Sequence, residues 1–190
     1  MHGNKGKNIC KIVIGGDGGT GKSTLLQTKK TGKFNFASKI TVGINFECFP
    51  ISCQGKEFTF LIYDLGGQKR FQFLHESYVV GSKAGIILYD LTRPKTFDNI
   101  VHWRDMLLKE NSGIPLIIAG TKLDLVQNAD IKFFTWKWEK LKKELLQNNL
   151  ILDHLFISSK NYIGIDEIFN ILATELTSQT ISNQISKISL

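Results

Sequence analysis

The sequence lacks the features of a membrane-spanning, secreted or fibrous protein. No apolar run approaches the roughly 20 residues needed to cross a bilayer, and the chain does not start with the apolar core of a secretion signal. Only 3 prolines occur, and neither an internal repeat nor a low-complexity block is present. With 190 residues, of which 42% are hydrophobic, the chain can bury the core of one compact domain.

Cysteine is also scarce, and the three that occur are Cys10, Cys48 and Cys53. Their number is odd and no CxxC pair is present, so the pattern provides neither a disulfide framework nor a zinc site. Reduced thiols of this kind are typical of a cytoplasmic protein.

Acidic residues are almost missing from the first fifth of the chain. Residues 1–39 hold eight lysines and one acid, Asp17, whereas residues 40–190 hold 16 basic and 16 acidic residues. The net charge of +7 therefore belongs to the N-terminal segment. A basic face for nucleic acid or anionic lipid is one interpretation, and a solvated charged surface is the more common one. Because the charge is not spread over a groove, we expect no nucleic-acid partner.

Apolar runs and helical stretches alternate along the chain. Short apolar runs typical of buried strands lie at 9–14, 84–91, 114–120 and 155–158. Two β-rich runs, at 44–53 and 56–64, are joined by Gln54 and Gly55, a hairpin signal. Helical stretches are predicted over 23–31, 96–111, 132–148 and 166–177.

This alternation predicts an α/β fold with a six-stranded, mostly parallel sheet. The hairpin adds one antiparallel edge strand, and about five helices cover both faces of the sheet. We expect a short basic extension over 1–8, one nucleotide-binding domain over 9–177, and a tail or helix extension over 178–190.

Residues 16–23 (GDGGTGKS) fit the phosphate-loop pattern G-x-x-x-x-G-K-[ST] without a mismatch. They follow a predicted strand and open a predicted helix, as the motif requires. Glycines let backbone N–H groups point at phosphate oxygens, and the helix N-terminus adds partial positive charge. Lys22 can then reach the β- and γ-phosphates, and Ser23 can bind Mg²⁺. The residues predicted to bind nucleotide here are Gly18, Gly19, Thr20, Gly21, Lys22, Ser23 and Thr24.

The phosphate loop does not identify the nucleotide, because kinases, ATPases and GTPases share it. Residues 120–124, at the end of another predicted strand, indicate guanine. The carboxylate of Asp124 can accept hydrogen bonds from N1–H and the 2-amino group of guanine, a donor pair that adenine lacks. Lys122 can lay its alkyl stem over the base, and the Ser159 N–H can meet O6. The predicted base-binding residues are Thr121, Lys122, Asp124, Ser158, Ser159 and Lys160.

The predicted strand over 56–64 ends in the sequence Asp-Leu-Gly-Gly-Gln at 64–68. Asp64 is suited to hold Mg²⁺ through a water, the Gly67 N–H can bond the γ-phosphate, and Gln68 can orient the attacking water as the catalytic residue. A simple glycine turn is the alternative. It is disfavoured because Asp64 falls where a second residue on the magnesium side is needed.

In this order the motifs resemble those of the small GTPases of the Ras superfamily, over nearly the whole chain. Lys22 and Thr41 are 19 residues apart, as in that family, and residues 41–46 are similar to a segment of its Rab-like members. The segments at 80–84 and 89–93 are also similar to Rab-like members, and residues 90–94 together with 64–68 resemble septation-type and archaeal Rab-like GTPases. The resemblance implies that Thr41 binds Mg²⁺ and senses the γ-phosphate, and that Phe34 lies against the guanine edge.

Some positions depart from the family pattern. Thr121 replaces the usual asparagine, as in Rho-type members, and Gly66 replaces the usual alanine, as in Arf-type members. Ser38 stands where many members carry a tyrosine. The tail over 178–190 has no cysteine, so a prenyl anchor is not expected, and the first glycine is at position 3, which does not fit N-myristoylation.

The resemblance implies a GTP/GDP molecular switch that uses Mg²⁺ and hydrolyses GTP slowly. No obvious arginine finger is present, so an activating protein is expected, together with an exchange factor and effectors. One alternative is a GTP-binding module with negligible hydrolysis. Another is an unrelated P-loop enzyme, which Asp124 disfavours. We expect a cytoplasmic monomer that meets membranes at most weakly or through a partner.

Overall fold

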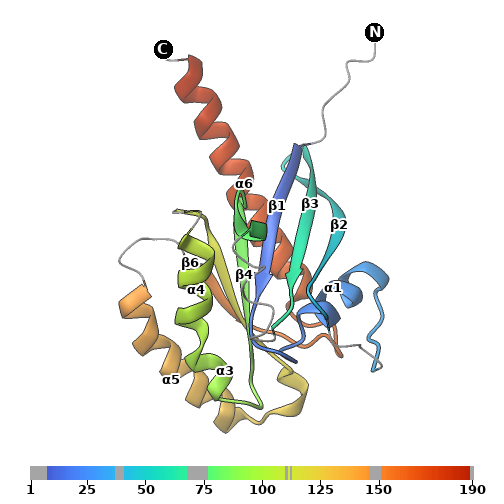
Figure 1. The fold of residues 1–190 in the computed structure, drawn as a ribbon, viewed down its shortest axis with the longest axis vertical. Coiled ribbons are helices and arrows are strands. Elements are labelled where there is room, and N and C mark those ends of the chain that lie inside the picture. Colours follow the sequence, from blue (N-terminus) through green and yellow to red (C-terminus); the bar gives the residue numbers. More distant parts are fainter. Residues whose placement is uncertain are drawn as a thin grey trace.

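The computed structural model describes residues 8–36, 41–67, 77–109, 111, 113–145 and 151–188, the last six of these by backbone alone. In these residues a six-stranded sheet has the order β2-β3-β1-β4-β5-β6 (Figure 1). The strands are β1 (Asn8–Gly15), β2 (Ile44–Cys53), β3 (Lys56–Leu65), β4 (Ala84–Asp90), β5 (Leu116–Thr121) and β6 (Ile151–Phe156). Among these six described strands only the edge strand β2 pairs antiparallel, so the predicted fold class is confirmed.

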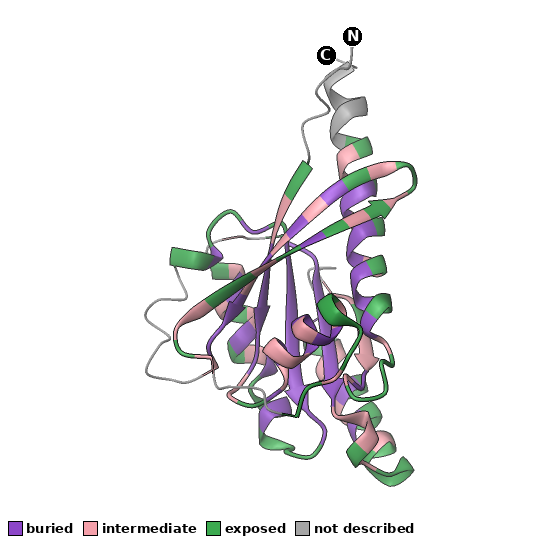
Figure 2. Cartoon of the chain, turned by 90° about the vertical axis from the view of Figure 1, so that its right-hand side faces the viewer, coloured by how far each residue is buried: buried purple, intermediate pink, exposed green. Residues whose placement is uncertain are grey.

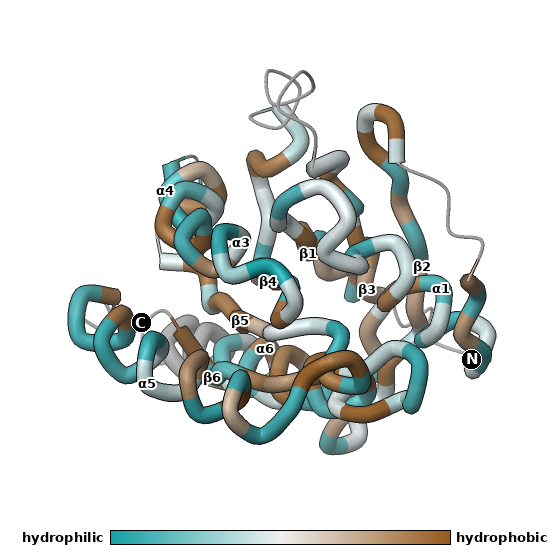
Figure 3. Tube along the Cα trace, turned by 90° about the horizontal axis from the view of Figure 1, so that it is seen from below, coloured by the Kyte–Doolittle hydropathy of each residue, from teal (hydrophilic) through white to brown (hydrophobic). Residues whose placement is uncertain are grey.

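Helices cover both faces of the sheet. They are α1 (Lys22–Thr31), α3 (Lys95–Asp98), α4 (Ile100–Lys109), α5 (Asn128–Leu145) and α6 (Ile165–Ile188), with a short 3₁₀ helix η2 (Leu123–Leu125). Seen from below, α3 and α4 lie on one side of the sheet and α6 on the other (Figure 3). Within the described ranges no helix is both long and apolar enough to cross a bilayer.

Each face of the sheet has its own core. On one face Leu25 of α1 and Phe169 of α6 pack against the strands. On the other face Trp103 of α4 and Phe134 of α5 do so. The central strands β4 and β5 are buried at every position (Figure 2), which explains why their sequences read as continuous apolar runs.

Three elements differ from the sequence expectation, and one of them is α5, which begins at Asn128 and not at residue 132. The last strand is β6 (Ile151–Phe156) and not 155–158, because an edge strand is only partly buried and lacks a continuous apolar run. The single helix expected over 96–111 is divided into α3 and α4 at Asn99. Of the two alternatives expected for 178–190, the structure has the helix extension, because the last helix continues to Ile188.

The parallel strands place their carboxyl ends at one edge of the sheet. Pairing sets Ile14 of β1 opposite Asp64 of β3, and Asp90 of β4 opposite Thr121 of β5. The loops that follow these strands carry the predicted motifs. Ligands of open α/β sheets bind outside this edge, so the topology brings the motifs to one site.

Candidate nucleotide-binding site

The phosphate loop leaves β1 and turns sharply into α1. Gly16 has a φ of +138°, and a Cβ on it would lie 2.2 Å from the carbonyl oxygen of Leu88. Gly21, directly before α1, is left-handed with a φ of 89°. These two glycines allow the path of the loop, so their spacing in the motif has a structural cause.

The side chain of Lys22 folds back over the loop. Its Nζ donates hydrogen bonds to the carbonyl oxygens of Gly16 and Asp17, at 2.7 and 3.0 Å. Burial lowers the pKa of Lys22 to about 8, although the carboxylates of Asp64 and Asp17 act in the opposite direction. An anionic ligand would stabilise this buried cation, and phosphate groups are such a ligand.

Three oxygen-bearing side chains from distant segments meet at the start of α1. The Oγ of Ser23 lies 2.6 Å from the Oγ1 of Thr41 and donates a short hydrogen bond to the Oδ2 of Asp64. The Thr41 hydroxyl lies 3.3 Å from that same Oδ2. The sequence predicted these three residues as magnesium ligands, and the structure brings them together.

One carboxylate oxygen of Asp64 lacks a hydrogen-bond partner within the described ranges, and this also favours a bound cation. Its Oδ1 is buried and has no hydrogen-bond partner in the described part of the chain. Burial raises the pKa of Asp64, against the lowering effects of the Ser23 hydroxyl, the Lys22 charge and the Thr41 hydroxyl. Orphaned buried oxygens are rare in folded proteins and call for an explanation. Hydroxyl and carboxylate oxygens are the hard ligands that Mg²⁺ prefers.

The chain after β3 passes close to two other loops. A Cβ on Gly67 would lie 2.4 Å from backbone atoms of Asp17 and Gly18. A Cβ on Gly66 would lie 2.5 Å from the carbonyl oxygen of Gly43, and the Gly66 N–H donates to that oxygen at 2.9 Å. Glycine at both positions therefore lets this segment contact both the phosphate loop and the segment that follows Thr41.

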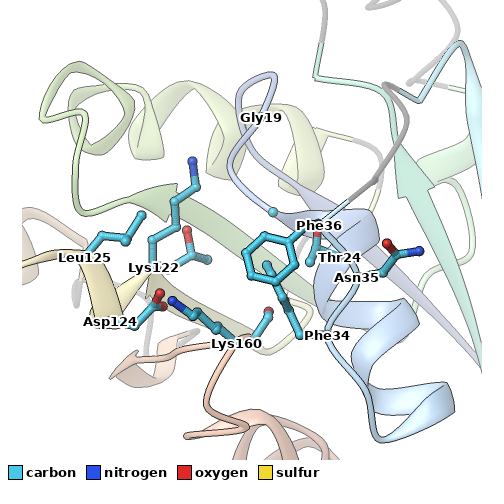
Figure 4. A pocket seen from close by; sticks show the side chains of 12 residues that line it. Gly19, Thr24, Phe34, Asn35, Phe36, Lys122, Asp124, Leu125 and Lys160 are labelled. Carbon is cyan, nitrogen blue, oxygen red and sulfur yellow. The ribbon is translucent and has the colours of Figure 1, made fainter.

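A cavity of about 330 Å³ opens beside the phosphate loop (Figure 4). Its walls come from the phosphate loop with α1, the segment after α1, and the loops after β5 and β6. The lining residues are Gly19, Gly21, Thr24, Phe34, Asn35, Phe36, Thr121, Lys122, Asp124, Leu125, Ser159 and Lys160. A second cavity of about 390 Å³ includes Ser23 and Asp64 in its wall. The predicted residues thus divide between a base side and a metal side.

Ser158 is placed behind the base side, not in its wall. Its side chain is buried, and its Oγ donates a 2.6 Å hydrogen bond to the Oδ1 of Asp124. The N–H of Asn161 donates to the same Oγ at 3.1 Å. Ser158 therefore orients the carboxylate that was predicted to select guanine.

Thr121 connects the base side with the phosphate side. Its Oγ1 is buried and lies 2.8 Å from the carbonyl oxygen of Thr20 and 2.9 Å from that of Tyr89. Thr20 in turn closes the phosphate loop, because its Oγ1 donates to the carbonyl oxygen of Asp17 at 2.9 Å. The threonine that replaces asparagine here can thus hold the loop through one hydroxyl.

An aromatic pair forms the wall opposite Asp124 (Figure 4). Phe34, which was predicted, packs edge to face against Phe36 at a centroid distance of 4.8 Å. Phe36 is 81% exposed, and the Nζ of Lys160 lies 6.0 Å from its ring centroid. Phe36 was not among the predicted residues, although the F-x-F repeat was a usable signal.

Asp17 is a further residue that sequence reasoning missed, because it occupies a variable position of the phosphate-loop motif. Its Oδ1 accepts a hydrogen bond from the Trp103 Nε1 at 2.9 Å, and its Oδ2 accepts one from the Asn99 Nδ2 at 2.7 Å. The loop is therefore anchored to the α3–α4 junction. The available signal was that Asp17 is the one acid among the first 39 residues.

Gln68, the predicted catalytic residue, lies outside the described residues, as does Ser38. The role of Gln68 in orienting water stays a prediction.

Comparison with known proteins identifies the family of the chain. The family model described as Ras family matches residues 11–178, a span that includes every predicted site residue. The chain is 31% identical over 179 residues to the Ypt/Rab-type GTPase YPT7 of Saccharomyces cerevisiae, covering 91% of this chain and 84% of that protein. It is 30% identical over 169 residues to the Ras-related protein Rab-19 of Mus musculus, covering 88% and 75%. It is 28% identical over 178 residues to Ras-related protein Rab-7b of Paramecium octaurelia, covering 91% and 84%.

One assignment follows from the phosphate-loop motif, from the carboxylate of Asp124 that Ser158 orients, and from the family match over most of the chain. The chain belongs to the Ras family and is a Rab-like small GTPase, a hydrolase of GTP.

Proposed function

We propose that this protein is a GTP/GDP switch that binds guanine nucleotide with Mg²⁺, hydrolyses GTP to GDP and phosphate, and presents its switch loops to effectors. The observation that carries the proposal is that the hydroxyls of Ser23 and Thr41 both contact the Oδ2 of Asp64, while its buried Oδ1 has no hydrogen-bond partner among the described residues. A site of this kind would be completed by a cation.

Guanine selection rests on Asp124. Ser158 fixes its Oδ1 at 2.6 Å, so the carboxylate is held toward the cavity before a ligand arrives. The Watson–Crick edge of guanine offers the donor pair that this carboxylate needs. Adenine offers none, so its binding would leave a desolvated carboxylate without partners.

Phosphate binding rests on the loop and on Lys22. In the structure its Nζ donates to two loop carbonyl oxygens, and phosphate oxygens would replace them as stronger, charged acceptors. The Ser23 and Thr41 hydroxyls and Asp64, the last through a water, would hold Mg²⁺. The bound ion supplies positive charge that stabilises the charge developing on the transferred phosphoryl group.

The switch itself would consist of two segments, roughly 34–43 and 66–79. The first would sense the γ-phosphate through Thr41 and the second through the Gly67 N–H. The Gly66 to Gly43 hydrogen bond of 2.9 Å joins the two segments, which supports a common response. Hydrolysis would remove the γ-phosphate contacts and release both. Gln68 would orient the attacking water.

A row of aromatic side chains is the surface that effectors and regulators would bind. Phe46 of β2, Tyr63 of β3 and Tyr78 follow one another at centroid distances of 6.3 and 6.1 Å. Phe46 is 63% exposed and Tyr78 is 41% exposed. β2 begins three residues after Thr41, and β3 ends directly before Gly66. Whether the switch segments are held or released would therefore affect the position of this aromatic row. Exposed aromatic rings are favourable anchors for a partner.

An activating protein and an exchange factor are the partners that the Rab-type relatives support in general. We further propose a monomer with no nucleic-acid partner, whose contact with membranes is weak or made through a partner.

The base assignment is tested by a nucleotide swap. Asp124→Asn should lose GDP binding and gain binding of xanthosine diphosphate, because the amide can donate where the carboxylate accepted. Asp130→Asn is the matched control, since Asp130 is an exposed carboxylate at the start of α5. Unchanged GDP affinity of Asp124→Asn would refute guanine selection by this residue.

Hydrolysis is tested by phosphate release under single-turnover conditions with bound GTP. An intrinsic rate on the order of 10⁻⁴ to 10⁻³ s⁻¹ is expected without an activating protein, and Gln68→Leu should lower it. Release at the buffer background, both alone and with a cell extract as a source of activating protein, would contradict the switch and support a GTP-binding module instead.

A further inference from the structure

A buried carboxylate at the end of β4 connects two loops of the site. Asp90 is fully buried. Its Oδ1 accepts hydrogen bonds from the N–H and Oγ1 of Thr92, at 2.9 and 2.7 Å. Its Oδ2 accepts hydrogen bonds from the Arg93 Nε at 2.7 Å and the Lys122 Nζ at 2.6 Å. Two cations therefore share one carboxylate oxygen.

Arg93 reaches from this carboxylate to the phosphate loop. While its Nε donates to Asp90, its Nη2 donates to the carbonyl oxygen of Gly18 at 2.9 Å. The same Nη2 would lie 3.4 Å from a Cβ on Gly19, so the guanidinium also packs against the next residue of the loop. Asp90 and Arg93 lie in the segment 89–93 that is similar to Rab-like members, but neither was predicted as a site residue.

Lys122 brings the base loop to the same carboxylate. Its side chain forms part of the wall of the base cavity, and its backbone is held in the left-handed region at a φ of 64°. Through Asp90, the loop that would hold the phosphates and the loop that would hold the base are joined by charge-assisted hydrogen bonds, which are stronger than neutral ones.

We propose that the Asp90–Arg93–Lys122 cluster is a latch that holds the phosphate and base loops together and thereby slows the release of guanine nucleotide. This inference rests on the proposed function, because it assumes that the site binds GDP. Arg93 and Asp90 act here as positioning residues, through Gly18 and Lys122.

The charge state of Asp90 is consistent with the latch. Burial alone would raise the pKa of Asp90, but hydrogen bonds from Lys122, Thr92 and Arg93 together hold it below its usual value. The carboxylate therefore stays ionised at neutral pH. Removing either cation leaves a buried charge with fewer partners, so the remaining contacts rearrange.

Arg93 is suited to an experiment because its side chain is 45% exposed and is not part of either core. Arg93→Ala removes the bridge to Gly18 and is not expected to unfold the protein. Asp90→Asn keeps an oxygen for Thr92 but removes the charge. Arg104→Ala is the matched control, because Arg104 pairs with the exposed Asp105 on α4 and lines neither of the two cavities of the site.

The measurement is the rate at which the fluorescent analogue mant-GDP leaves the full chain in excess unlabelled GDP and Mg²⁺. Arg93→Ala and Asp90→Asn should each speed release about tenfold, as expected for one lost charge-assisted hydrogen bond. The double variant should release no faster than the faster single variant, because both changes open the same latch. Arg93→Lys keeps a cation and should restore part of the slow release. The melting temperature of each variant at saturating GDP distinguishes faster release through loss of the latch from general destabilisation of the fold.

The outcomes separate a failure of nucleotide binding from a failure of the latch. A wild-type protein that retains no mant-GDP would refute the proposed function, and the latch with it. A wild-type protein that retains it, with Arg93→Ala releasing at the wild-type rate, would refute the latch alone. Rates of the single variants that multiply in the double variant would also refute it, because Arg93 would then act independently of Asp90.

Discussion

The indole Nε1 of Trp103 donates a hydrogen bond of 2.9 Å to the carboxylate of Asp17, across 86 positions of the sequence. The same indole ring fills the space beside Gly15, where a Cβ would lie 2.8 Å from the ring. A buried core residue of α4 thus holds the phosphate loop from behind. The loop is positioned by the core of the domain as well as by its own glycines.

Asp17→Ala should destabilise the protein, because it removes the acceptor for both Trp103 and Asn99. We expect the free energy of unfolding to fall by about 1–3 kcal/mol, and Asp17→Asn, which keeps one side-chain oxygen, to lose less. Urea denaturation at fixed GDP and Mg²⁺ measures both. Asp105→Ala, which removes an exposed carboxylate on α4, should change little. Equal stability of Asp17→Ala and wild type would show that the anchor is energetically irrelevant.

Ser158→Ala should weaken GDP binding indirectly, through its effect on Asp124. The Asp124 carboxylate would lose the 2.6 Å hydrogen bond that fixes its direction, so we expect affinity to fall about five- to twentyfold. Calorimetric titration with GDP measures the change. Ser178→Ala removes an exposed hydroxyl on α6 and serves as the control. If Ser158→Ala binds GDP as tightly as wild type, Asp124 does not need this support.

Removing the metal should speed GDP release. Chelation of Mg²⁺ by EDTA is expected to accelerate mant-GDP release about tenfold or more in the wild-type protein, because the phosphates lose a bound dication. Ser23→Ala should release rapidly already, and EDTA should then add little. Thr31→Ala, which removes an exposed hydroxyl at the other end of α1, should respond like wild type. An undiminished EDTA effect in Ser23→Ala would exclude the Ser23 hydroxyl as a ligand.

Acid should destabilise the fold through His154. Burial lowers the pKa of His154 to about 4; its ring stacks on Trp138 at 4.4 Å, and its Nε2 lies 2.9 Å from the Tyr89 hydroxyl. Between pH 6.5 and 4 the unfolded chain binds a proton here that the folded chain does not. The free energy of unfolding therefore decreases as the pH falls from 6.5 to 4, by about 3 kcal/mol at most. Below pH 4 this histidine contributes no further loss of stability.

Denaturation curves at pH 7 and pH 4.5 measure this effect. His154→Phe keeps an aromatic ring but binds no proton, so its loss of stability between the two pH values should be smaller than that of wild type. His102→Phe, at an exposed position of α4, should lose as much as wild type. The same pH dependence in His154→Phe and wild type would contradict a titrating role for this residue.

Local patterns in the sequence predicted most of the strands and helices. Strand β4 was recognised because each of its residues is buried, which leaves a continuous apolar run. The start of β6 was missed because an edge strand is partly exposed and mixes Asp153 and His154 with apolar residues. The division between α3 and α4 at Asn99 was missed because the helical pattern continues across the break.

The sequence by itself determined which chemical groups are available to the candidate site. The glycines and Lys22 of the phosphate loop, the hydroxyl of Ser23 and the carboxylates of Asp64 and Asp124 follow from motifs a few residues long, because each motif needs a local backbone shape and a side chain at a fixed offset. Tertiary structure alone decided what holds those groups in place. The contacts of Asp17 with Trp103, of Arg93 with Gly18 and of Lys122 with Asp90 join residues 86, 75 and 32 positions apart. No local pattern encodes such pairs, because the order of the strands and the packing of α4 on the sheet bring them together.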